Sequence, residues 1–197
     1  MTERGAEWAK WDLHVHTPAS LWHNYRTSGK EDVWEKYIKE LEALPPEFKV
    51  IGVNDYFFID GYERLTNAKA SGRLSNIDLL LPVIELRLDM FGGTESSLSR
   101  ANLHVIFDPE LTPDEIRTQF ISTLHTSYKL ASDHDDLTWS QILTEQSVVE
   151  LGKLVRESLP EEHKRVAGTN EELGFRALVF SLDSVTKALS EVTSQVL

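Results

Sequence analysis

The chain alternates short apolar runs with longer segments whose apolar residues recur every three or four positions. Short runs of this kind are typical of buried strands, and the wider spacing is typical of one face of a helix. Pro45-Pro46 ends the first helical segment, because proline cannot continue the hydrogen-bond ladder. Strands alternating with helices favour an α/β fold with a largely parallel sheet. The pattern predicts strands at residues 11–15, 48–53, 79–84 and 102–107, and helices at 31–44 and 62–73.

Helical patterns dominate the second half of the chain. Thr112, followed by Pro113 and two acidic residues, is typical of a helix start and predicts a helix to about residue 130. Thr169 and Glu172 resemble a capping box that opens the last helix. The other expected elements are a Gly/Ser-rich loop at 90–101, a polar loop at 132–136, a helix at 138–159 and a short strand at 177–180.

Composition and charge narrow the class of protein. The 197 residues include no cysteine, which excludes disulfides, thiolate metal sites and cysteine nucleophiles and fits a cytoplasmic location. The 32 acidic and 20 basic residues give a formal charge of −12, which argues against a broad nucleic-acid-binding surface. No apolar run approaches the ~20 residues of a membrane-spanning helix, so we expect no membrane association.

The first candidate for chemistry is the pair His14 and His16, separated by one residue. Alternation along a strand places both imidazoles on the same face. Two neighbouring imidazoles can begin a divalent-metal site. The same spacing also fits two histidines on the solvent face of a strand.

Three further polar residues accompany the later apolar runs. Asp55 and Glu85 directly follow two of them, and His104 lies inside a third. Each residue by itself also fits a common structural role. Asp55 can cap a turn, Glu85 can face solvent at the end of a strand, and His104 can be a hydrogen-bonded histidine of the core. In parallel α/β folds, however, the carboxyl ends of strands line the active site. Their joint placement therefore favours a functional cluster.

Four segments in order, WDLHVHTPAS, GVNDYFFIDGY, LLLPVIELRL and NLHVIFDPE, resemble the first motifs of the PHP (polymerase and histidinol phosphatase) domain. The resemblance implies an α/β fold, a distorted (β/α)7 barrel with two or three divalent metals, and phosphoester hydrolysis. It covers about residues 11–110, and we expect residues 1–110 to form the N-terminal part of a metal-binding barrel. Residues 111–197 would be a mainly helical remainder that completes the barrel, forms an insertion or provides an interface. The chain is shorter than the about 250 residues of a full barrel, so we expect an incomplete one.

The resemblance assigns metal-binding roles residue by residue. His14 and His16 match the histidines that hold the first metal. Glu85 matches the carboxylate that bridges two metals, with a catalytic role, and His104 matches a ligand of the second. The nitrogen and oxygen donors suit Mn, Zn or Fe.

The sequence departs from the family pattern at two places. Asp55 matches the Asp of the family's Thr-Asp-His, with a catalytic role, but Tyr56 replaces the histidine that would bind a third metal. His23 lies near another third-metal position, and two metals are the better fit. No late Asp-x-His follows His104, and only His125, His134 and His163 remain after it.

The sequence thus predicts a metal-dependent phosphoesterase, with nuclease activity as one form of it. The motif variant is most similar to PHP domains at the N-terminus of TrlF-type and SMC-like AAA ATPases, some of which act in anti-phage defence. The alternative is a catalytically incomplete PHP-like module that regulates or binds a partner ATPase, which the missing late ligands favour. An unrelated amidohydrolase-type barrel shares the His-x-His start but needs a bridging lysine that no strand end supplies.

Overall fold

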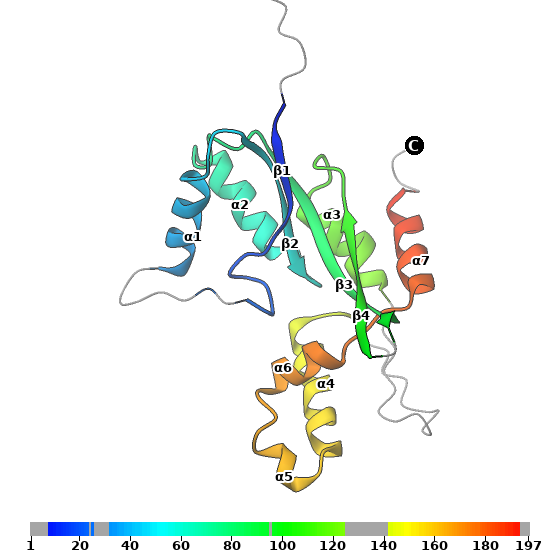
Figure 1. Cartoon of the computed structure of the whole chain (residues 1–197). Coiled ribbons are helices and arrows are strands. Elements are labelled where there is room, and N and C mark those ends of the chain that lie inside the picture. Colours follow the sequence, from blue (N-terminus) through cyan, green and yellow to red (C-terminus); the bar gives the residue numbers. More distant parts are fainter. Residues whose placement is uncertain (1–7, 24, 26–31, 95, 125–141, 194–197) are drawn as a thin grey trace, which may run out of the picture. The chain divides into compact units, whose positions relative to one another are not determined.

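The structure, a computed structural model, describes residues 8–23, 25, 32–94, 96–124 and 142–193. The protein is an α/β protein with a four-stranded sheet in the order β1-β2-β3-β4 (Figure 1). The strands are β1 (Lys10–Val15), β2 (Phe48–Tyr56), β3 (Leu79–Thr94) and β4 (Ser97–Ile106). The described residues therefore contain four strands, and a complete seven-stranded barrel is not seen among them.

Strands β1 and β2 pair in parallel, as the alternating pattern predicts. Asp12 pairs with Ile51 and Val15 with Val53, so the polar end of β1 lies beside the buried middle of β2. Gly52 lets the two strands approach closely, because a Cβ built there would lie 2.7 Å from the Cα of Leu13. This close approach fixes the start of the segment that carries the histidine pair.

Helices α1 (Val33–Glu42) and α2 (Asp60–Ala70) connect the first three strands, which confirms both predicted helices. The side chain of Asp32 caps α1 by accepting hydrogen bonds from the backbone N–H groups of Trp34 and Glu35. The buried face of α1 contributes aromatic and aliphatic side chains to the core, among them Tyr37. The helix ends before the proline pair, as expected.

Two strands extend further than the sequence pattern predicted, beyond residues 53 and 84. Strand β2 continues through Asp55 to Tyr56, and β3 continues through Glu85 to Thr94. Both carboxylates therefore lie inside strands rather than after them. The polar side chains are buried within the sheet, which a pattern based on apolar runs cannot detect.

The predicted loop at residues 90–101 is wrong, because this segment forms the far end of β3 and the start of β4. Figure 1 shows β4 returning alongside β3 as a hairpin. Both arms are solvent-exposed, so they need no apolar pattern, and backbone pairing forms them instead. Gly93 near the turn has φ 125°, a conformation that glycine adopts without strain.

The chain divides into two compact units. The first comprises Met1–Ile84 and His104–Pro113, and the second comprises Glu85–Leu103 and Asp114–Leu197. The second unit therefore includes the β3–β4 hairpin together with most of the helical half. Its helices are α3 (Pro113–Glu115), α4 (Glu145–Ser158), α5 (Glu161–Lys164), α6 (Asn170–Ala177) and α7 (Leu182–Thr193).

The helix predicted from Thr112 is confirmed as a helical segment to Thr123, but its geometry is irregular, and the predicted part beyond Leu124 lies outside the described residues. After α3 the backbone passes through a π turn (Ile116–Phe120) and a 3-10 turn (Ile121–Thr123), and Leu124 is extended. Hydroxyls in this segment donate to carbonyls four residues earlier, for example Thr118 to Asp114 at 2.8 Å. Such bonds compete with the helical ladder and bend helices. The predicted polar loop at 132–136 lies outside the described residues.

Two capping boxes begin the helices of the second unit. Thr144 and Ser147 cap α4, so the described part of this helix starts later than the predicted residue 138. Thr169 and Glu172 cap α6, which confirms the predicted capping box, but α6 is not the last helix, because α7 follows it. The predicted strand at 177–180 reduces to a single bridge between Leu88 and Phe180. Within the described ranges, no helix has both the length and the apolar character needed to cross a membrane.

Candidate metal centre

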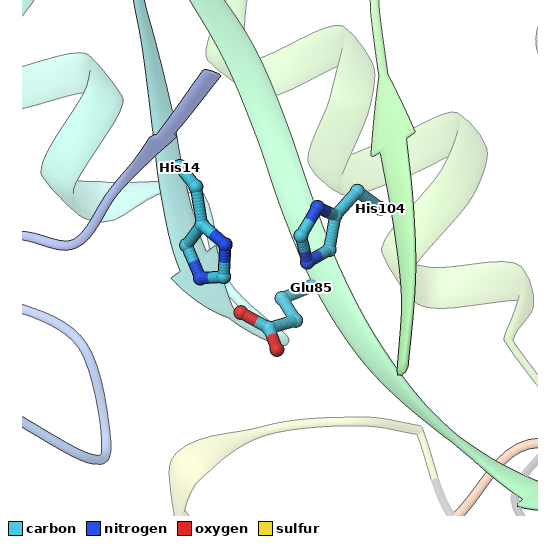
Figure 2. Close-up of side chains that lie close together, drawn as sticks. All are labelled: His14, Glu85 and His104. Carbon is cyan, nitrogen blue, oxygen red and sulfur yellow. The ribbon is translucent and has the colours of Figure 1, made fainter. Parts of the chain in front are cut away.

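Three ligand side chains from three strands converge in the sheet. His14 of β1, Glu85 of β3 and His104 of β4 each offer a donor atom, and these atoms all lie within 4.8 Å of one another. Figure 2 shows the two imidazole rings and the carboxylate pointing toward a common point. The ring centroids of His14 and His104 are 4.6 Å apart at an interplanar angle of 82°. We call these residues the His–Glu–His cluster.

The carboxylate of the cluster is buried, whereas both imidazoles are exposed. Glu85 is 1% exposed and lies within an otherwise apolar stretch of β3. A buried carboxylate requires a partner, because transfer of an isolated charge out of water is costly. Besides the hydrogen bond that it accepts from Asn102, the carboxylate lies beside the two exposed rings, where a bound divalent cation would remain open to a ligand from solvent.

Asn102 orients the carboxylate, and the sequence analysis missed it. Its Nδ2 donates a hydrogen bond of 2.5 Å to Oε1 of Glu85. Asn102 precedes His104 by two residues on β4, so both side chains project from the same face of the strand. The spacing of two residues between Asn102 and His104 was the signal that could have identified it.

His16 lies beside the cluster rather than in it. Its Nε2 is 3.2 Å from Nε2 of His14, a distance at which one neutral imidazole donates to the other. Its ring also stacks on Tyr56, with centroids 5.0 Å apart and planes at 19°. Tyr56 therefore supports the ring of His16.

Asp55 holds the segment that follows the histidine pair. Its Oδ1 accepts the backbone N–H of Thr17 at 2.7 Å, and its Oδ2 accepts the Thr17 hydroxyl at 2.6 Å. Burial raises the pKa of Asp55 from 3.8 to about 6, and the two bonds from Thr17 partly oppose this rise. The structure therefore places this carboxylate on Thr17 rather than among the cluster's donor atoms.

The backbone next to Asp55 adopts an unusual conformation. Phe57, which is fully buried, has φ 67°. Non-glycine residues rarely adopt the left-handed region, and such residues gather at functional sites. The sequence contains no signal for this conformation.

His23 and the later histidines do not join the cluster. His23 is exposed and lines a pocket with Trp22, Tyr25, His16 and Tyr56. His163 is an exposed residue of α5. His125 and His134 lie outside the described residues.

The donor set of the cluster fits one divalent transition-metal ion. Two imidazole nitrogens and one carboxylate oxygen suit Mn, Zn or Fe, and fewer than four protein ligands leave positions open for water or substrate. Among the described residues, this is the one group of three His, Asp or Glu side chains whose ligand atoms all lie within 4.8 Å of one another. The second metal that the family resemblance implies stays a prediction.

Comparisons of the chain with protein-family models, with curated proteins and with solved structures found no match. A functional proposal for this chain therefore depends on the geometry of the His–Glu–His cluster and on the residues that carry the PHP resemblance.

Proposed function

We propose that the protein is a metal-dependent phosphoesterase of PHP type, in which His14, Glu85 and His104 hold a divalent ion. The observation that carries the proposal is the convergence of three donor atoms within 4.8 Å from β1 and from the β3–β4 hairpin. An ion held by these residues would supply Lewis-acid chemistry for a phosphoester and would lower the pKa of a bound water. Hydrolysis of phosphoesters is the activity that the PHP resemblance implies.

In this proposal each residue of the site has a separate role. Glu85 provides the buried negative charge, and Asn102 fixes its orientation through the bond to Oε1. The exposed imidazoles of His14 and His104 complete the donor set from the solvent side. His16, 3.2 Å from His14, adds a further imidazole beside the cluster, where the resemblance implies a metal ligand.

The resemblance extends the proposal to the biological setting. PHP domains with this motif variant accompany SMC-like or AAA ATPases, so we propose that an ATPase, fused or separate, controls the hydrolysis. Nucleic acid is then a candidate substrate. Because the chain carries a formal charge of −12, contact with a polyanion would depend on the metal and on the partner.

Metal titration followed by a hydrolysis assay tests the proposal. We expect protein stripped with a chelator to bind Mn²⁺ or Zn²⁺ in calorimetry, and to hydrolyse bis(p-nitrophenyl) phosphate only after metal is restored. His104→Ala should abolish both. The matched control His163→Ala removes an exposed histidine outside the cluster and should leave both unchanged.

The outcomes separate the proposal from its alternative. If the wild type binds no divalent ion, the metal centre does not exist. If it binds metal at the cluster but hydrolyses no phosphoester, the chain is a metal-binding module without this activity, which matches the non-catalytic alternative.

A further inference from the structure

Aromatic side chains line a pocket of about 380 Å³ in the first compact unit. This volume is sufficient for one small organic ligand. Among the described residues the lining includes no lysine, arginine, aspartate or glutamate, so this part of the pocket presents ring faces and hydrogen-bonding ring edges. Its lining residues are His16, Trp22, His23, Tyr25 and Tyr56.

Several contacts fix these rings before any ligand enters. The Tyr25 hydroxyl donates to the backbone carbonyl of His16 at 2.7 Å, and its ring packs edge-on against the buried Tyr37. The backbone N–H of Tyr25 donates to Nδ1 of His23 at 3.2 Å. Tyr56 stacks on His16. A pocket whose walls are already ordered loses little conformational entropy on binding.

One residue joins the pocket to the His–Glu–His cluster. His16 lines the pocket, and its Nε2 lies 3.2 Å from the Nε2 of the cluster ligand His14. A phosphoryl group bound at His14 would therefore lie next to the pocket, with only His16 between them. The pocket would then receive the organic group that is attached to the phosphoryl group.

We propose that the pocket binds the base of a nucleotidyl phosphoester whose phosphoryl group lies at the His–Glu–His cluster. Bases stack on aromatic side chains, and Trp22, which is 40% exposed, and Tyr56 provide suitable rings. The histidine edges can hydrogen-bond with base edges. A quaternary ammonium ligand fits less well, because none of the described lining residues is a carboxylate. The proposal deepens the proposed phosphoesterase function and rests on it.

A pair of substrates with the same leaving group tests the proposal. Thymidine 5′-(p-nitrophenyl phosphate) and methyl p-nitrophenyl phosphate present the same phosphodiester, and only the first carries a base. We expect the wild type to show a higher kcat/KM for the thymidine ester. Trp22→Ala should lower the ratio of the two kcat/KM values about 5- to 100-fold, whereas Trp22→Phe should largely retain it. His163→Ala, outside the pocket, should leave the ratio unchanged.

A binding measurement keeps this test independent of hydrolysis. We expect saturation-transfer NMR with thymidine and metal-free protein to show transfer to the base protons, and Trp22→Ala to remove it. Transfer without hydrolysis of either ester would support the pocket and overturn the phosphoesterase. Metal-dependent hydrolysis with equal kcat/KM for the two esters and no transfer would support the phosphoesterase and overturn the pocket.

Competition identifies the source of the base. Thymidine 5′-monophosphate and a single-stranded thymidine oligonucleotide would each compete with the thymidine ester if the pocket binds a base. Stronger competition by the monophosphate indicates a small nucleotide substrate, and stronger competition by the oligonucleotide indicates the end of a single strand. Absence of competition by both would contradict base binding.

Discussion

At Glu85 a carboxylate lies inside a strand whose neighbouring side chains are apolar. Ile84 and Leu86 on either side of it are fully buried, and Asn102 is the hydrogen-bond donor to its Oε1. Polar residues inside a buried run usually have a specific partner. Asn102 is one such partner of Glu85, and the two imidazoles of the cluster lie beside the same carboxylate.

Removing the donor to Glu85 should weaken metal binding without removing a ligand. We expect Asn102→Ala to reduce the affinity for Mn²⁺ or Zn²⁺ about 10- to 100-fold, because outer hydrogen bonds hold ligands in position. Calorimetric titration of the metal-free protein measures this change. An affinity equal to that of the wild type would show that Asn102 does not position the carboxylate.

Asp55 should make the folded protein less stable as the pH rises, which is the opposite of the usual effect of a carboxylate with a lowered pKa. Its pKa is about 6 in the folded state, against 3.8 as the ordinary value, so the folded protein binds the proton more tightly. The stability linked to this proton is present below pH 4 and is lost as the pH rises through about 6. The difference of about two pH units corresponds to at most about 3 kcal/mol.

The variant Asp55→Asn isolates this effect. Its amide can still accept the backbone N–H of Thr17 and can donate to the Thr17 hydroxyl oxygen. We expect the wild type to lose up to about 3 kcal/mol relative to the variant between pH 4 and 7, measured by urea unfolding in chelator. A difference that stays constant across this range would contradict the raised pKa.

At the scale of elements, close helix packing in the second unit depends on two glycines. A Cβ on Gly152 of α4 would lie 1.7 Å from the carbonyl oxygen of Asn170, and one on Gly174 of α6 would lie 1.9 Å from that of Val148. The contacts are to backbone atoms, which cannot rotate away as a flexible side chain can. The two helices must therefore separate if either glycine gains a side chain.

Gly152→Ala should destabilise the second unit despite the higher helix propensity of alanine. We expect a loss of about 2–3 kcal/mol in the free energy of unfolding, measured by urea denaturation followed by circular dichroism. Gly92→Ala is the matched control, because no atom lies within 4 Å of its added Cβ. Equal effects of the two substitutions would show that α4 and α6 do not pack so closely.

The elements that the sequence predicted well are those whose signals are local. Apolar runs located the cores of all four strands, and the capping residues Thr169 and Glu172 located α6. The β3–β4 hairpin escaped prediction because its arms are exposed and backbone pairing holds them together. In the candidate site, His14, Glu85 and His104 stood out as polar residues in apolar surroundings. Trp22 and Tyr25 did not, because they follow no periodic pattern.

At the scale of the whole molecule, metal binding should stabilise the folded chain. An ion that binds the folded state and not the unfolded state adds RT ln(1 + [L]/Kd), about 2.7 kcal/mol at a concentration 100 times Kd. We expect the melting temperature of the wild type to rise with Mn²⁺ concentration. Glu85→Gln can still accept the Asn102 bond and should fold, but it should show no such rise. An equal rise in this variant would place the bound ion elsewhere.

Gly61 has a consequence for genetic experiments on this protein. A Cβ at this position would lie 2.0 Å from Oδ2 of Asp55 and 2.2 Å from the Thr17 hydroxyl oxygen. Any other amino acid would displace the carboxylate and, through Thr17, the chain segment directly after His16. In a saturation mutagenesis screen scored by survival or activity, codon 61 should thus tolerate as little variation as the codons of the His–Glu–His cluster, although glycine itself performs no chemistry.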